Sequence, residues 1–101
     1  LKTVLNSDFV LRMPDFSKPF ILDTDASNES IGAALSQKFE EMNNETGLIE
    51  EVERPVGFFS KNLTKAERNY STTEKELLAI VASCEHFKFY LFGKHFLIRT
   101  D

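Results

Sequence analysis

The sequence predicts a mixed α/β domain, in which a three-stranded antiparallel meander is followed by a helix and by a fourth strand parallel to the first. Three observations support this fold class. Strand-like segments precede the one clear amphipathic helix, a capping signature opens that helix, and another apolar segment follows it. A helical crossover naturally places the strand after it parallel to an earlier strand. With 101 residues, the chain forms one domain at most.

The first two strands are predicted from alternation and turn residues. After a turn between Pro14 and Pro19, residues 20–25 alternate, with 20, 22 and 24 on one face and 21, 23 and 25 on the other. This strand is apolar at its start and acidic at its end. A turn at 28–30 leads to SIGAALSQKF (30–39), the second predicted strand. A helix is the alternative there, because Ala, Leu, Gln and Lys favour helices.

The remaining elements complete the predicted order. The polar residues 40–53 are expected to form the tip of a long hairpin, and PVGFFS (55–60) to form the third strand. Two capping boxes follow, and the second opens a helix from about Thr72 to Tyr90 that ends near Gly93. KHFLIRTD (94–101) is the predicted last strand. The capping boxes are Thr64 with Glu67 and Ser71 with Glu74, and the apolar positions expected to face the sheet are 77, 80, 81, 84, 87 and 91.

Composition excludes several classes of protein. With 42% hydrophobic and 28% charged residues, the chain has enough apolar side chains for a core and is not a disordered tail. No apolar run approaches the roughly 18 residues that span a bilayer. The single cysteine, Cys84, cannot form an internal disulfide, which is consistent with a reducing compartment. A net charge of −4 argues against a purely electrostatic nucleic-acid binder.

Acidic residues mark a candidate metal site. Two strands end alike, in Leu-Asp-Thr-Asp (22–25) and Ile-Arg-Thr-Asp (98–101). If these strands are parallel neighbours, Asp25 and Asp101 reach the same sheet edge, where ligands bind in open α/β sheets. Asp23 remains an alternative to Asp25, because both side chains point to the same side of the strand.

Glu76, in the first turns of the predicted helix, is the third candidate ligand. Its helical position predicts that it faces the sheet rather than water. A carboxylate in apolar surroundings needs a compensating partner, and a divalent cation would supply one. Taken singly, an Asp at a strand end or a Glu in a first helical turn is also explained as a turn former or as a partner of the helix dipole.

Three segments resemble a known family: PDFSKPFILDTDASNESIGAALSQ, RPVGFFSKNLTKAERNYSTTEKELLAIV and FYLFGKHFLIRTD. In order and spacing they resemble the RNase H domain of reverse transcriptases from gypsy-type LTR retrotransposons. The resemblance implies an RNase H-like fold with a five-stranded mixed sheet in the order 3-2-1-4-5. Residues 1–13 resemble the linker from the connection region, so 14–101 is the expected RNase H-like domain. The family's last strand, final helix and fourth acid would follow Asp101, so we expect a C-terminally truncated domain.

The resemblance also implies a site and a reaction. The family's metal-binding acids fall on Asp25, Glu76 and Asp101, which favours Asp25 over Asp23. Two Mg²⁺ or Mn²⁺ ions held there would support endonucleolytic cleavage of the RNA strand of RNA–DNA hybrids during reverse transcription. In related cellular and retroviral enzymes Gly follows the first acid, whereas this chain has Ala26, as retrotransposon members do.

The implied partners are an RNA–DNA hybrid and the polymerase and connection domains of the same polyprotein, with no membrane. The implied location is the cytoplasm, within virus-like particles, or the nucleus. Tyr70, Ser71 and Thr72 precede Glu76 at the helix N-terminus and are candidates for phosphate or sugar contacts. Capping by Ser71 is the alternative. The alternative function is a non-catalytic RNase H-like module that positions nucleic acid or scaffolds a polymerase, although such a module has no reason to keep three carboxylates.

Overall fold

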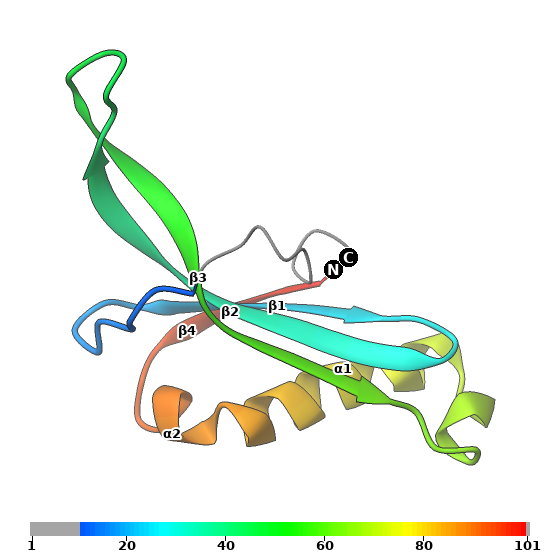
Figure 1. The fold of residues 1–101 in the computed structure, drawn as a ribbon. Coiled ribbons are helices and arrows are strands. Elements are labelled where there is room, and N and C mark those ends of the chain that lie inside the picture. Colours follow the sequence, from blue (N-terminus) through cyan, green and yellow to red (C-terminus); the bar gives the residue numbers. More distant parts are fainter. Residues whose placement is uncertain (1–10, 101) are drawn as a thin grey trace.

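The computed structural model describes residues 11–100, which form one four-stranded sheet covered on one face by helices (Figure 1). The sheet order is β3-β2-β1-β4, with β1 antiparallel to β2, β2 antiparallel to β3, and β4 parallel to β1. This confirms the predicted meander, crossover and parallel fourth strand. The elements are β1 (Phe20–Ala26), β2 (Ser30–Met42), β3 (Ile49–Asn62), the 3-10 helix η1 (Glu67–Asn69), α1 (Thr72–His86), α2 (Lys88–Leu91) and β4 (Phe96–Thr100).

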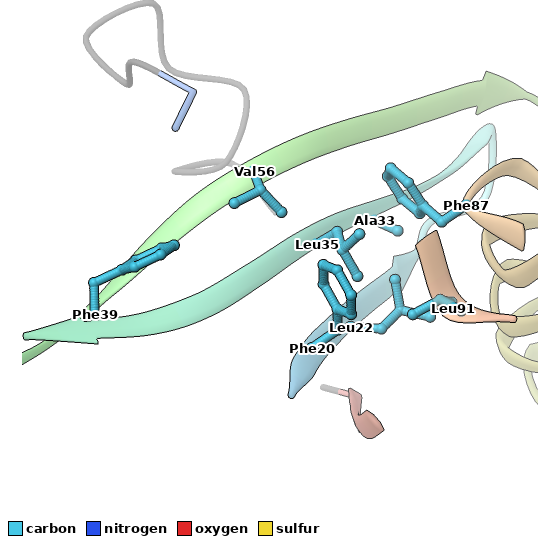
Figure 2. Close-up of a cluster of buried hydrophobic side chains, with 8 residues drawn as sticks. All are labelled: Phe20, Leu22, Ala33, Leu35, Phe39, Val56, Phe87 and Leu91. Carbon is cyan, nitrogen blue, oxygen red and sulfur yellow. The ribbon is translucent and has the colours of Figure 1, made fainter. Parts of the chain in front are cut away.

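The hydrophobic core lies between the sheet and the helices, as Figure 2 shows. In β1, Phe20, Leu22 and Thr24 are buried whereas Asp23 and Asp25 are half-buried, as the predicted alternation requires, although Ile21 is buried as well. A fully buried Leu or Phe side chain contributes about 1.5–3 kcal/mol to folding, so this apolar face accounts for much of the sheet's attachment to the helices. The main cluster comprises Phe20, Leu22, Ala33, Leu35, Phe39, Val56, Phe87 and Leu91.

Residues 30–39 form a strand and not the alternative helix. β2 is an inner strand, and Ala33, for example, pairs with Thr24 of β1 on one side and with Phe59 of β3 on the other. Ladder hydrogen bonds on both sides outweigh a local helix propensity of a few tenths of a kcal/mol per residue. No helix within residues 11–100 is long and apolar enough to cross a membrane.

Residues 40–53 form the tip of the long hairpin between β2 and β3, as predicted, and most of this tip is strand. Pairing continues to Met42 opposite Ile49, and only residues 43–48 form the turn. Asn43 stabilises this turn, since its backbone N–H donates to Leu48 O and its side-chain oxygen accepts from Glu45 N. The predicted third strand, 55–60, is accordingly only part of β3.

A β-bulge separates this hairpin from the body of the sheet. The register shifts between Leu35, opposite Gly57, and Ser36, opposite Pro55, so that Val56 is an extra residue in β3. Bulges bend a strand and increase its twist, and beyond this point the two strands turn away as a projecting ribbon (Figure 1). Pro55 is compatible with β3 because β3 is an edge strand, and its carbonyl accepts from Arg12 N at 2.9 Å.

Only part of the predicted apolar face is buried. Phe87 and Leu91 are buried and Cys84 packs against the core cluster, as predicted, whereas Leu77 and Val81 are 56% and 64% exposed. Within α1 the buried residues are Lys75, Ala79 and Ser83. The buried positions recur every four residues and carry small side chains at 79 and 83, which allow the helix to approach the sheet closely. Apolar periodicity alone does not detect such a stripe, because Ala and Ser add little to it.

The predicted helix over Thr72–Tyr90 is also interrupted. α1 ends at His86, Phe87 leaves helical geometry at φ −97° and ψ 17°, and α2 follows over Lys88–Leu91. Gly93 has φ +70°, in agreement with its predicted place at a helix end. Of the predicted linker 1–13, residues 1–10 lie outside the described residues, so the domain boundary stays a prediction.

Candidate metal centre

Asp25 and Glu76 line one depression at the edge of the sheet. Asp25 comes from the end of β1 and Glu76 from the first turns of α1, and Thr100 at the end of β4 lies beside them. The depression has a volume of about 200 Å³, and its other lining residues are Thr24, Ala26 and Ala79. The sequence predicted that Asp25 and Glu76 share a site, and the structure places both at this depression.

The parallel pairing of β1 with β4 explains this location. Thr24 is opposite Thr100, so the carboxyl ends of the two strands meet at one edge, as predicted from their shared Thr-Asp endings. Asp101 follows Thr100 directly but lies outside the described residues. Its distance from Asp25 therefore stays a prediction.

A capping box positions the start of α1. The Ser71 hydroxyl accepts from Glu74 N at 3.2 Å, and Glu74 Oε1 accepts from Ser71 N at 2.9 Å. This confirms the predicted box and fixes the first helical turn, from which Glu76 projects. One turn later, Ala79 is 1% exposed and packs with Ile31 and Leu63, so this part of the helix is held close to the sheet.

Glu76 is exposed, so the expectation that it faces the sheet rather than water was wrong. Lys75 occupies the buried position, and the next residue along a helix points about 100° away from it. The desolvation of Glu76 consequently provides no reason to expect a metal ion. What remains is its position at the depression that Asp25 also lines.

The side chains of this depression fit a hard divalent cation. Two carboxylates and the hydroxyls of Thr24 and Thr100 are all oxygen donors, which Mg²⁺ and Mn²⁺ prefer. Within residues 11–100, no three His, Cys, Asp or Glu side chains are grouped closely enough to hold a metal ion. The described part of the chain thus supplies two of the three predicted acidic ligands.

Asp23, the alternative to Asp25, has a different partner. Both of its carboxylate oxygens accept from Arg99 of β4, at 2.7 Å from Nε and 2.8 Å from Nη2, and Nη2 also donates to Glu53 of β3 at 2.6 Å. The carboxylates that accept these hydrogen bonds, Asp23 first and Glu53 second, raise the pKa of Arg99. We call these three residues the Arg99 clamp.

The Arg99 clamp was not predicted, although the sequence contains a signal for it. Asp23 and Arg99 hold equivalent places in the two strand endings, Leu-Asp-Thr-Asp and Ile-Arg-Thr-Asp. If two parallel strands align these endings, the Asp of one strand lies opposite the Arg of the other, directly before the paired threonines. The structure has this pairing, with Asp23 opposite Arg99.

Contacts of Tyr70, Ser71 and Thr72 with nucleic acid stay a prediction. All three residues are exposed, and Tyr70 is 41% exposed. The hydroxyl of Ser71 caps the helix, as the alternative explanation proposed.

Comparison with known proteins identifies the family. The sequence model of the RNase H-like domain found in reverse transcriptase matches residues 1–98. This chain belongs to that family. It is 44% identical over 101 residues to the retrovirus-related Pol polyprotein from transposon 297 of Drosophila melanogaster, a match that covers all of this chain and 8% of the polyprotein. It is 43% identical over 103 residues to the transposon Tf2-3 polyprotein of Schizosaccharomyces pombe, covering 7% of it.

These relatives confirm the resemblance of this RNase H-like domain to retrotransposon Pol polyproteins, of which it spans under a tenth.

Solved structures confirm the RNase H-like fold. The foamy viral protease-reverse transcriptase dRH in complex with double-stranded DNA superposes with a TM-score of 0.71 at 15% identity, over 98% of this chain and 16% of the viral one. The foamy viral protease-reverse transcriptase in complex with an RNA/DNA hybrid gives a TM-score of 0.63 at 17% identity, over 89% of this chain and 11% of the viral one.

Proposed function

We propose that this RNase H-like domain cleaves the RNA strand of RNA–DNA hybrids by metal-dependent hydrolysis during reverse transcription. The observation that carries the proposal is the meeting of Asp25 and Glu76 in one depression beside the end of β4. Membership of a domain family found in reverse transcriptases supports it, as does the hybrid bound by the foamy viral protein of similar fold.

In this proposal Asp25, Glu76 and Asp101 hold two Mg²⁺ or Mn²⁺ ions. When bound, these ions would activate the attacking water and stabilise the leaving 3′ oxygen. Asp25 supplies an anionic oxygen from a fixed strand, because its backbone is paired with Gly32 of β2. Glu76 supplies a second one from a helix whose first turn is capped. Its exposure leaves its carboxylate open to a bound duplex.

The proposed substrate contacts and partners follow from this site. Tyr70 and Thr72 would meet the sugar-phosphate backbone, and selectivity for the hybrid would come from the RNA 2′-hydroxyls and the shape of the duplex. Ser71 would contribute indirectly, since its hydroxyl is engaged in capping. The polymerase and connection domains of the same polyprotein would deliver the hybrid, in cytoplasmic virus-like particles or in the nucleus.

Cleavage of an RNA–DNA hybrid by the full polypeptide that contains this chain tests the proposal. Asp25→Asn and Glu76→Gln preserve side-chain shape but replace an anionic ligand by a neutral amide. Each should slow Mg²⁺-dependent cleavage by several orders of magnitude, because stabilisation of the developing charge by the metal is worth several kcal/mol. Circular dichroism should show an unchanged fold.

Glu85→Gln is the matched control for Glu76→Gln. Glu85 is exposed on the same helix and forms an ion pair with Lys88 at 3.0 Å. Its replacement should leave cleavage unchanged. If the Asp25 and Glu76 variants cut the hybrid as fast as the unaltered polypeptide, the domain is instead a non-catalytic module that positions nucleic acid or scaffolds the polymerase.

A further inference from the structure

We propose that Arg99 is a positioning residue for the metal site, because it fixes the end of β4 against the end of β1. This inference rests on the proposed function, since it concerns the same carboxylates. β4 (Phe96–Thr100) pairs with β1 over its whole length, from Phe96 opposite Phe20 to Thr100 opposite Thr24. The carboxyl ends of the two strands meet only while this register is kept.

The two ends of β4 are held in different ways. At its start, Phe96 packs against the main core cluster. Near its end, Arg99 reaches across the sheet and holds Asp23 of β1 and Glu53 of β3 by hydrogen bonds of 2.6–2.8 Å. The planar guanidinium matches a carboxylate with two parallel hydrogen bonds, which restrict orientation as well as distance. The Arg99 clamp therefore ties three of the four strands together on one face.

The clamp lies immediately before the metal-site residues. Asp23 precedes Asp25 by two residues, and Arg99 precedes Asp101 by two. Alternate residues of a strand share a face and are separated by roughly 7 Å, so Asp23 of the clamp and the proposed ligand Asp25 are neighbours on one face of β1. By fixing the strands against each other at this point, the Asp23–Arg99 pair would determine how closely the following carboxylates can approach one ion.

The direction in which Arg99→Gln changes the metal affinity distinguishes a positioning role from a purely electrostatic one. Arg99 is a cation close to a site for cations, so its charge by itself weakens metal binding. Arg99→Gln would then tighten binding if charge were all that mattered. A positioning role has the opposite effect, since loss of a residue that orients metal ligands commonly weakens affinity 10- to 100-fold. The clamp is partly exposed, at 42%, 31% and 34% for Arg99, Asp23 and Glu53, so global stability should change little.

The experiment is a Mn²⁺ titration of the full polypeptide that contains this chain, followed by the electron paramagnetic resonance of free Mn²⁺. Arg99→Gln should raise the Mn²⁺ dissociation constant about tenfold. Arg99→Lys keeps the charge but loses the two parallel hydrogen bonds of the guanidinium, so it should weaken Mn²⁺ binding to a smaller extent. The double variant Arg99→Gln/Asp23→Asn should be no weaker than either single variant, because both remove the same contact. Gln37→Leu, which destabilises the fold away from the site, should leave the dissociation constant unchanged.

Two failures can be told apart. If Mn²⁺ binding is lost in Asp25→Asn but is unchanged or tighter in Arg99→Gln, the positioning role is wrong and the metal site stands. If the unaltered polypeptide binds no Mn²⁺, or binds it equally well after Asp25→Asn, the proposed metal site is wrong and the role of Arg99 falls with it. Additive losses in the double variant would also overturn the positioning role, because the two residues would then act separately.

Discussion

The ring of Phe87 lies so close to the backbone of Gly57 that a Cβ atom at position 57 would come within 2.8 Å of Cε1. Phe87 is the residue between α1 and α2, is only 3% exposed, and points into the main core cluster (Figure 2). Its ring occupies the space that any side chain on this part of β3 would need. Gly57 is required here by close packing and not by an unusual backbone angle, since its φ is not positive.

Gly57→Ala should therefore destabilise the domain. Overpacking of a well-filled core typically costs about 1–3 kcal/mol, because the ring or the strand must shift. Urea unfolding followed by circular dichroism measures this loss. Phe87→Leu should relieve the clash, so the double variant should lose less stability than the sum of the two single variants. Strict additivity would show that the ring does not cause the effect.

Gln37 provides a second stability test. It is fully buried on β2, where its Nε2 donates to Asp15 O at 2.7 Å and Lys18 O at 3.0 Å, and its Oε1 accepts from Asp15 N at 2.8 Å. Gln37→Leu keeps much of the volume but leaves these backbone groups without their partner. Since one buried unsatisfied group costs about 1–3 kcal/mol, we expect a loss of at least about 2 kcal/mol in urea unfolding.

The neighbouring exposed residue is the control for this substitution. Lys38 is exposed and forms a long ion pair of 3.7 Å with Glu51, so Lys38→Gln should change the free energy of unfolding by less than about 0.5 kcal/mol. Equal losses at positions 37 and 38 would contradict the role assigned to the buried amide.

The predictable part of the fold rested on strong local patterns. Alternation in β1, with Phe20 and Leu22 buried, and the reciprocal bonds of Ser71 with Glu74 follow from chemistry within a few residues. The buried face of α1 does not. That face depends on how closely the helix approaches the sheet, and this close approach is possible because Ala79 and Ser83 have small side chains.

The site was predictable to a similar degree. Shared strand endings placed Asp25 at the edge of the sheet, and the structure puts Glu76 beside the same depression. The Arg99 clamp was not predicted, because it depends on the register of two strands separated by the meander and the helix. The opposite charges of Asp23 and Arg99 predict an ion pair only when the register of β1 and β4 is known.

Ser71→Ala should lower the stability of the domain by about 1 kcal/mol, the usual cost of losing a helix N-cap. The substitution removes the oxygen that accepts from Glu74 N at 3.2 Å. Urea unfolding measures the change, and Ser71→Asp, which keeps a capping oxygen, should restore most of it. If Ser71→Ala and Ser71→Asp are equally unstable, capping is not the contribution of this residue.

The capping box also predicts a dependence of stability on pH. The pKa of Glu74 lies below its ordinary value of 4.5, first because Ser71 N donates to its carboxylate and second because of its side-chain hydrogen bond with Ser71. A folded-state pKa below the unfolded one favours the folded protein when the carboxyl is ionised. This contribution is therefore complete above the unfolded value and is lost as the pH falls through the lowered pKa.

Glu74→Gln isolates the charge, because Gln can still accept the hydrogen bond from Ser71 N. The unaltered chain should exceed this variant in urea midpoint near neutral pH, and the difference should shrink as the pH falls below about 4.5, the ordinary pKa of the group. Nuclear magnetic resonance titration of the Glu74 carboxyl carbon measures the folded-state pKa directly. A midpoint difference that grows in acid, or a Glu74 carboxyl that titrates above 4.5, would show that the box does not favour the ionised form.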